Sequence, residues 1–284
     1  MTAPHFVLTL SCPDTVGIVH AVSGVLVEQH CNIVDSAQFG DPGTNRFFMR
    51  VTFAAPAGTD RAAMERAFAA TAKRFAMALR VDERGAKTRT LILVSRFGHC
   101  LNDLLFRAGS GALAIDVAGV ASNHTDFAEL AAGHRIPFHH LPVTAASKAE
   151  QEARLLALVD SLGVELVVLA RYMQVLSNDL CRKLVGRAIN IHHSFLPSFK
   201  GAKPYHQAYE RGVKLIGATA HYVTPDLDEG PIIEQEAIRV DHAMDPDELV
   251  AVGRDVECVV LARAVKLHVE RRVLLNGSRT VVFG

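Results

Sequence analysis

Residues 188–197 read Ala-Ile-Asn-Ile-His-His-Ser-Phe-Leu-Pro, an apolar run interrupted by an amide and by imidazoles. Asn190 and His192 alternate through Ile191, so in a strand both polar side chains project from the same face. Two polar groups on one face of a buried strand are costly unless they are paired or face a cleft. The segment therefore predicts a central strand that carries reactive groups at its carboxyl end.

Similar short, β-branched runs occur at residues 90–95, 112–121 and 164–170, with helical segments such as 149–162 between them. Apolar strands that alternate with helices indicate an α/β fold, here a mostly parallel, Rossmann-like sheet covered on both faces. Residues 215–223 and 232–240 predict two later strands, 246–271 a long helix and 280–283 a small terminal strand. Ligands of such sheets bind at the carboxyl ends of the strands, where Asn190 and His192 fall.

The first part of the chain has a different pattern. Strands are predicted at residues 5–11, 32–39, 46–53 and 79–81, and helices at 18–30 and 61–78. This is a βαββαβ, ferredoxin-like order. The polar stretch 82–87 is typical of a linker. We therefore expect a first domain at 1–83, a linker at 84–89 and a second domain at 90–284.

Composition narrows the classes of partner. The 284 residues hold 30 Lys+Arg and 30 Asp+Glu, so no global field favours nucleic acid or an anionic membrane. Five widely spaced cysteines form no Cys-x-x-Cys pair and fit reduced thiols of a cytosolic protein better than a disulfide framework or a zinc site. The sequence shows no signal peptide and no membrane span. The expected location is cytoplasmic.

Residues 224–231, Thr-Pro-Asp-Leu-Asp-Glu-Gly-Pro, form a loop with three carboxylates. Alone it would be a solvated acidic turn. Its flanking strands are apolar, however, and a parallel sheet would bring the loop to the end of the strand that carries Asn190 and His192. Three acids could bind a metal ion, but no second oxygen-rich cluster supports one, so no metal is expected.

These motifs resemble a known family. Asn190-x-His192 with Ser194-x-Leu196-Pro197, then His221-Tyr222-Val223 and the loop 226–231, are similar to the folate-dependent formyltransferase/hydrolase family from about residue 90 onward. The first unit, with Asp-Thr-Val-Gly-Ile-Val at 14–19, resembles an ACT domain. The resemblance implies that Asn190, His192 and Asp228 act on the formyl group of 10-formyltetrahydrofolate, which is the substrate, with no separate cofactor.

The resemblance also implies where the folate binds. Residues 169–176 follow an apolar strand and would form a wall against the pterin. His206, at the start of a predicted helix, would lie near the mouth of the site, although a helix-capping role fits it equally. The implied substrate-binding residues are Ala170, Arg171, Tyr172, Met173, Val175, Leu176, Thr224, Asp226 and His206.

The lack of a glycine-rich segment after the first strand of the second domain indicates which group accepts the formyl group. Transfer to a phosphorylated amine needs a glycine-rich anion nest after the first strand. Residues 95–102, Ser-Arg-Phe-Gly-His-Cys-Leu-Asn, contain one glycine and several bulky side chains. We therefore expect a hydrolase that cleaves the formyl C–N bond, with a water placed by Asp228 and the oxyanion stabilised by Asn190 and a protonated His192. Formate would feed purine synthesis, and tetrahydrofolate would return to the one-carbon pool.

Two alternatives stay open: a formyltransferase that uses an amine acceptor, and a folate-binding regulator without turnover. For the ACT-like unit, Asp14, Gly17, Asn32 and Asp35 could form a site for an amino-acid effector such as glycine or methionine where two such domains meet. A dimerisation module without ligand fits equally. In both cases a homo-oligomer is expected.

Overall fold

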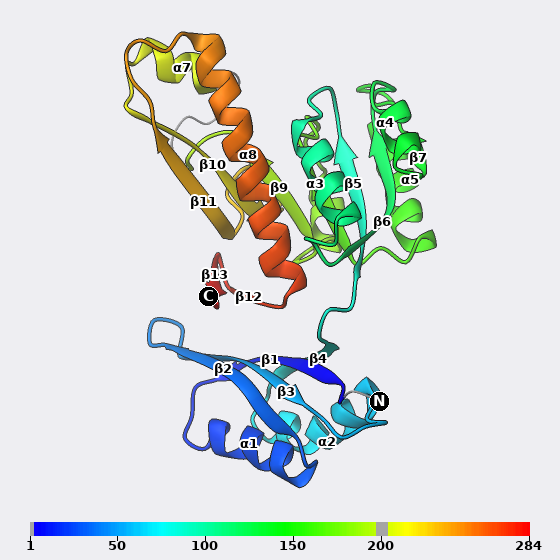
Figure 1. Ribbon diagram of the computed structural model, residues 1–284, viewed down its shortest axis with the longest axis vertical. Coiled ribbons are helices and arrows are strands. Elements are labelled where there is room, and N and C mark those ends of the chain that lie inside the picture. The colour runs from blue at the N-terminus through cyan, green and yellow to red at the C-terminus, as the bar shows by residue number, and fades with distance from the viewer. Residues whose placement is uncertain (1–2, 197–203) are drawn as a thin grey trace. The chain divides into compact units, whose positions relative to one another are not determined.

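The computed structural model describes residues 3–196 and 204–284, so Pro197 of the quoted motif and the segment 198–203 lie outside the described residues. The chain divides into two compact units (Figure 1). The first comprises residues 1–86 together with 270–276 and 280–284. The second comprises residues 87–269 and 277–279. No helix among the described residues is both long and apolar enough to span a membrane.

The first unit contains the predicted βαββαβ order. Its elements are β1 (His5–Pro13), α1 (Ile18–Glu28), β2 (Asn32–Asp41), β3 (Arg46–Ala54), α2 (Arg61–Arg74) and β4 (Ala78–Glu83). The strands form one sheet in the order β2-β3-β1-β4, and the recorded pairings are antiparallel. This confirms the ferredoxin-like fold of the first unit.

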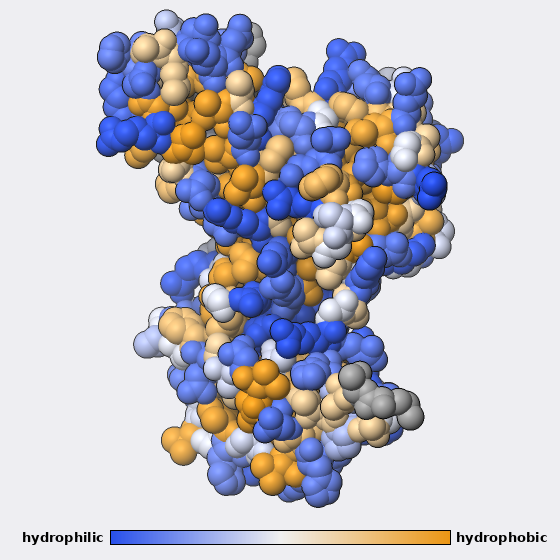
Figure 2. Space-filling view, viewed as in Figure 1, coloured by the Kyte–Doolittle hydropathy of each residue, from blue (hydrophilic) through white to orange (hydrophobic). Residues whose placement is uncertain are grey.

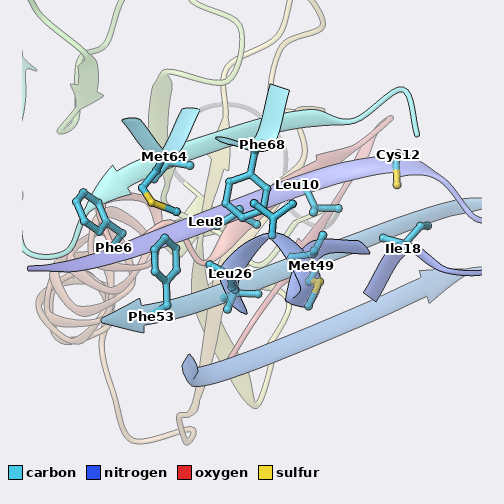
Figure 3. Close-up of a cluster of buried hydrophobic side chains, with 14 of the residues drawn as sticks. Phe6, Leu8, Leu10, Cys12, Ile18, Leu26, Met49, Phe53, Met64 and Phe68 are labelled. Carbon is cyan, nitrogen blue, oxygen red and sulfur yellow. The ribbon is translucent and has the colours of Figure 1, made fainter. Parts of the chain in front are cut away.

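Alternation along the strands explains the core of this unit. Every second residue of β1 is buried, from Phe6 to Cys12, and joins the apolar sides of α1 and α2 (Figure 3). Phe6 stacks on Phe53 of β3 with ring centroids 5.7 Å apart. Asp60 begins α2, because its side chain accepts a hydrogen bond from the amide of Ala63 at 2.6 Å.

The C-terminal residues cover another part of this sheet. Strands β12 (Val273–Asn276) and β13 (Arg279–Val282) form a hairpin, of which the sequence predicted only the second strand. Val281 and Phe283 form an apolar cluster with the buried Phe48 of β3. Asn276 donates to the buried Asp41 carboxylate at 2.6 Å. The end of the chain is thus part of the packing of the first unit.

The second unit is built on a seven-stranded sheet in the order β11-β10-β9-β8-β5-β6-β7. Strands β5 (Thr88–Val94), β6 (Ile115–Ser122), β7 (Phe138–His140), β8 (Leu166–Leu169) and β9 (Ala188–His192) are parallel. Strand β10 (Leu215–Tyr222) is antiparallel to β9 and to β11 (Ile232–Arg239). The mostly parallel α/β fold is confirmed, with one reversed strand.

Helices cover both faces of this sheet (Figure 1). They are α3 (His99–Gly109), α4 (Ala128–Gly133), α5 (Lys148–Ser161), α6 (Asn178–Lys183), α7 (Pro204–Glu210) and α8 (Pro246–Val269). Helices α5 and α6 pack on the face that contains Leu91, Leu93 and Val167. Helix α8 packs on β9, β10 and β11 and beside α3. On the side drawn in Figure 2, hydrophilic and hydrophobic residues are interspersed over each unit.

Candidate active site

The strand β9 brings Asn190 and His192 to one face at its carboxyl end. Register places His221 of β10 opposite Asn190 and Thr219 opposite His192. The amide nitrogen of Asn190 lies 3.3 Å from Nε2 of His221. The polar residues predicted on one face of the strand therefore meet a further imidazole on the neighbouring strand.

The loop with Asp228 reaches this site by a route that the sequence reasoning had wrong. Because β10 is antiparallel to β9, Tyr222 at its end pairs with Ile189, near the amino end of β9. The loop must then fold back to bring Asp228 to His192. Gly230 makes this possible: a Cβ there would lie 1.7 Å from the carbonyl oxygen of Tyr222. The close approach of the Gly230 backbone to that of Tyr222 therefore brings the Asp228 carboxylate to the site, and a parallel arrangement of the strands does not.

Asp228 sits between two imidazoles. Its Oδ1 lies 3.2 Å from Nδ1 of His192 and 3.8 Å from Nε2 of His221. Burial alone would raise the pKa of Asp228, but hydrogen bonds from His192 and His221 outweigh it and hold that pKa well below its usual value. The residue has φ 57°, a left-handed conformation that Asp and Asn tolerate better than most side chains. The site contains a firmly ionised carboxylate.

His192 presents one ring nitrogen to the cavity side of this arrangement. The side chain is buried, and Nδ1 faces Asp228. Its Nε2 is also buried and has no hydrogen-bond partner among the described residues. A buried polar atom without a partner is costly, so such an atom in a cavity wall is suited to a ligand.

The turn after β9 is held by Thr219. Its hydroxyl donates to the carbonyl of Ser194 at 2.9 Å and accepts from the amide of Leu196 at 3.0 Å. Gln235 of β11 donates to that hydroxyl at 2.9 Å and to the Leu196 carbonyl at 3.1 Å. The backbone of Ser194 is therefore part of this turn.

These groups line a cavity of about 710 Å³ in the second unit. Tyr172 and Leu176 are buried in its wall, whereas Met173 and Val175 are half-exposed. Ala170 is fully buried and hydrogen-bonded by its amide to Leu93 at 2.8 Å. Of the implied substrate-binding residues, the cavity lining includes Arg171, Tyr172, Met173, Val175, Leu176, Thr224, Asp226 and His206.

The wall at residues 171–173 is fixed by the end of β5. Ser95 donates its amide to the carbonyl of Arg171 at 3.2 Å, and its hydroxyl accepts from the amide of Met173 at 3.0 Å. The hydroxyl of Tyr172 accepts a hydrogen bond from Gln151 at 3.1 Å, and burial raises the pKa of Tyr172 to about 12. The wall is therefore held in place by hydrogen bonds to Ser95 and, at Tyr172, is neutral.

A second polar cluster lies at the same cavity, and the sequence reasoning missed it. The carboxylate of Glu257 on α8 is 1% exposed. It lies 2.7 Å from Nε2 of His99, accepts from the hydroxyl of Tyr205 at 2.7 Å, and lies 3.4 Å from Nε of Arg171. The sequence feature that could have revealed this cluster is a glutamate inside the apolar run 256–261, Val-Glu-Cys-Val-Val-Leu. His221 and His193 were also left without a role.

This second cluster includes the set of possible metal ligands found among the described residues. Ligand atoms of His99, Cys100 and Glu257 lie within 4.8 Å of one another. Both oxygens of Glu257 already have protein partners, and the guanidinium of Arg171 lies beside it. A metal cation would displace these bonds and meet a fixed positive charge. The donor set therefore fits a hydrogen-bonded network better than a metal centre.

The four residues implied for an amino-acid effector are separated within one chain. Gly17 begins α1, at φ 96°, and Asp14 follows β1, whose last residue pairs with Arg46. Asn32 pairs with Ala54 at the opposite end of the sheet. Asp35 forms an ion pair with Arg50 at 3.2 Å. A site that used all four residues would need a second copy of the chain.

Comparison with known proteins agrees with both parts of the chain. A family model described as formyl transferase matches residues 88–265, and a model described as ACT domain matches residues 6–69. A formyltetrahydrofolate deformylase of a Corynebacterium species is 56% identical over 277 residues, which cover 97% of each chain. One from Bacillus subtilis is 47% identical over 97% of this chain and 93% of its own.

Solved structures show that the similarity extends to the three-dimensional fold. A formyltetrahydrofolate deformylase from Burkholderia mallei superposes with a TM-score of 0.95 at 56% identity, covering 99% of this chain and 100% of that one. Glycinamide ribonucleotide transformylase 1 of Symbiobacterium toebii has a TM-score of 0.67 at 32% identity, covering 71% of this chain and 97% of its own. The deformylase structure covers both units of this chain, whereas the transformylase covers only 71% of it. The chain belongs to the formyltetrahydrofolate deformylase family, with an ACT domain followed by a formyl transferase domain.

Proposed function

We propose that this chain hydrolyses 10-formyltetrahydrofolate to formate and tetrahydrofolate. The observation that carries the proposal is the meeting of Asn190, His192 and Asp228 at one cavity, in a chain whose full-length relatives bear the deformylase name. The formyl group lies between the amide and the imidazole, and the pterin lies along the wall formed by Tyr172 and its neighbours.

In the proposed reaction a water attacks the formyl carbon. Nδ2 of Asn190 and Nε2 of a protonated His192 donate to the oxygen, which becomes an oxyanion. Preorganised donors of this kind typically contribute about 3–4 kcal/mol each. The unpartnered, buried Nε2 of His192 supports this role, because substrate oxygen would supply its missing partner.

Asp228 holds His192 through Nδ1 and orients the attacking water. Its low pKa makes it a weak base, so it relays the proton of the water and does not retain it. The C–O bond to water forms, the C–N10 bond breaks, and N10 takes up the relayed proton as it leaves. The second proton of the water is released to solvent when the formic acid ionises. Formate and the secondary amine of tetrahydrofolate are the products.

Water is the acceptor in this proposal because of the loop after β5. Helix α3 begins at His99, and a Cβ at Gly98 would meet the Phe127 ring at 2.3 Å. Phe97 and His99 themselves line the cavity. Bulky side chains stand where a phosphorylated amine would need a glycine-rich nest of amides.

The test incubates the purified protein with 10-formyltetrahydrofolate and no amine. We expect rapid formate release together with equimolar tetrahydrofolate. Tetrahydrofolate release that begins only after an amine is added would show that the protein is a formyltransferase and not a hydrolase. Binding of the folate without any release of formate would show that the protein is a folate-binding regulator.

We further propose a homo-oligomer with an amino-acid site at the ACT domain, formed by Asp14, Gly17, Asn32 and Asp35 across two copies. The separation of these residues within one chain favours a shared site over a single-copy one. All five cysteines are unpaired, which fits the reducing cytoplasm. Thermal shifts with glycine and with methionine test the site, because a ligand bound only by the folded state raises its stability.

A further inference from the structure

Arg171 contributes a buried cation to the second cluster of the cavity. It follows Ala170 after the end of β8, at φ 64°, and its side chain is 9% exposed. The guanidinium carbon lies 5.4 Å from the centroid of the Phe97 ring, and Nε lies 3.4 Å from Oε2 of Glu257. The guanidinium is therefore held between an aromatic face and a carboxylate.

Two nitrogens of this guanidinium have no hydrogen-bond partner among the described residues. They are the buried Nε and Nη1, of which Nε has an ion-pair contact with Glu257 and Nη1 has none. A desolvated N–H of a charged group without an acceptor is expensive, more so than one of a neutral group. Because Arg171 lines the cavity, a ligand there can supply the acceptor.

The neighbours of Arg171 leave this cation only partly compensated. Burial would raise the pKa of Glu257, but its bond with His99 and the charge of Arg171 hold that pKa below its usual value, so the carboxylate is ionised. Its two oxygens are shared with His99 and Tyr205. Burial, with the charge of Arg171, lowers the pKa of His193 to about 3, so this imidazole is neutral.

Several contacts connect Arg171 to the reacting groups. His193 adjoins His192 in the chain, with ring centroids 5.2 Å apart, and its ring lies 6.2 Å from that of Tyr205. Tyr205 is bonded to Glu257, which pairs with Arg171. A chain of contacts thus links the proposed oxyanion site to the guanidinium along one cavity wall.

We propose that Nη1 of Arg171 binds a carboxylate, and that this carboxylate is the formate released from the formyl group. The inference rests on the proposed hydrolysis and adds a subsite for its product anion. Arginine matches the planar, two-oxygen geometry of formate and donates charge-assisted hydrogen bonds to it. The substrate is neutral at the formyl group, so the subsite acts only after the C–N10 bond has broken.

A second source of the same chemistry is the glutamate carboxylate of the folate itself. Two observations favour formate. Arg171 is nine-tenths buried, and it lines the same cavity as His192 and His193. A glutamate tail carries two charges and is better accommodated where water can reach it.

The first experiment measures binding of ¹³C-labelled formate to the free protein by NMR line broadening. We expect saturable binding to the wild type, and binding at least about tenfold weaker in Arg171→Lys and Arg171→Gln, from the loss of a charge-assisted hydrogen bond. The matched control is Arg182→Gln, an exposed arginine of α6 paired with Asp179, which should bind as the wild type does. No saturable binding to the wild type overturns the proposal, whether or not the variants fold. Equal binding by wild type and folded Arg171 variants, with melting temperature as the check of folding, also overturns it.

The second experiment separates the two carboxylates. Initial rates are measured with 10-formyltetrahydrofolate and with 10-formyltetrahydropteroate, which lacks the glutamate. Under the proposal, Arg171→Lys weakens inhibition by added formate about tenfold and changes KM alike for both substrates. A KM increase confined to the glutamate-bearing substrate would assign Arg171 to the tail instead and overturn the formate subsite.

Because formate binding is measured without turnover, the two proposals fail separately. Formate binding in a protein that never releases formate removes the hydrolysis but leaves an anion subsite. Hydrolysis in a wild-type protein that does not bind formate removes the subsite alone.

Discussion

Nδ1 of His192 lies 3.2 Å from Oδ1 of Asp228, and this contact joins a strand end to a loop that returns from the opposite end of the neighbouring strand. The carboxylate stays ionised because its hydrogen bonds to His192 and His221 outweigh the cost of burial. The contact makes the Asp228 side chain a means of orienting the imidazole as well as a relay for the proton of water.

Replacing Asp228 by Asn tests the charge without disturbing the backbone, because Asn also tolerates φ 57°. We expect kcat to fall by at least about two orders of magnitude, since the water and the imidazole lose their charged partner. Substrate affinity, measured by binding to the inactive variant, should change little. The control is Glu229→Gln, the exposed carboxylate next in the loop, which should keep nearly full turnover. Near-normal kcat in Asp228→Asn would contradict the proposed mechanism.

Asn190→Ala removes an oxyanion donor. We expect kcat and kcat/KM to fall together by about two orders of magnitude, because the lost hydrogen bond is strongest in the transition state. Steady-state kinetics with 10-formyltetrahydrofolate check this. Asn102→Ala, an exposed amide on α3, is the control. If Asn190→Ala raises KM and leaves kcat intact, the amide binds the ground state and the oxyanion role is wrong.

Gly230→Ala should displace the Asp228 loop. The added Cβ would lie 1.7 Å from the carbonyl oxygen of Tyr222, and a backbone atom cannot rotate away as a side chain can. We expect a lower melting temperature and a loss of turnover similar to that of Asp228→Asn. Gly24→Ala on α1 is the control, because nothing lies within 4 Å of its Cβ. An active, stable Gly230→Ala variant would show that the loop can reach the site by another route.

The lowered pKa of His193 determines the direction in which its contribution to stability changes with pH. Burial and the charge of Arg171 lower its pKa from 6.5 to about 3, so between these values the unfolded chain binds a proton that the folded chain does not. The free energy of unfolding therefore falls as pH decreases through this window, by up to about 1.4 kcal/mol per pH unit. His193→Gln should flatten that slope between pH 6 and 4, by about one bound proton. Urea denaturation at several pH values measures it, and identical slopes for both proteins would refute the assignment.

Phe283→Ala tests the C-terminal hairpin. Phe283 is buried with Val281 against Phe48, so its truncation leaves a cavity in the first unit. We expect a loss of about 3 kcal/mol in stability. Turnover at low temperature should persist, because the cavity that carries the catalytic groups is lined by residues of the second unit. Val282→Ala, half-exposed on the same strand, is the milder control. An unchanged melting temperature in Phe283→Ala would mean that the hairpin does not stabilise the unit.

Much of this architecture could be predicted from local pattern. The burial of every second residue along β1 and the continuous apolar runs at β5 and β8 are local consequences of which faces a strand buries. These patterns predicted the fold class of each unit. The three-residue β7 and the strand β12 escaped prediction, because so short a run has no distinctive period.

The residues of the second cluster could not be joined from the sequence. His99, Arg171, Tyr205 and Glu257 come from four separate segments, and no spacing between them is informative. Only the packing of α3, α7 and α8 around the end of β8 brings them within hydrogen-bond distance. The burial of Arg171 follows from the same packing.

By itself the sequence determined the two fold classes and the alternation that puts Asn190 and His192 on one face, because these depend on neighbours in the chain. The direction of β10, the return of Asp228 to His192 and the unpartnered nitrogens of Arg171 were decided only by the tertiary structure. They depend on hydrogen bonds and backbone approaches between distant segments, such as that of Gly230 to Tyr222, and these have no local signature.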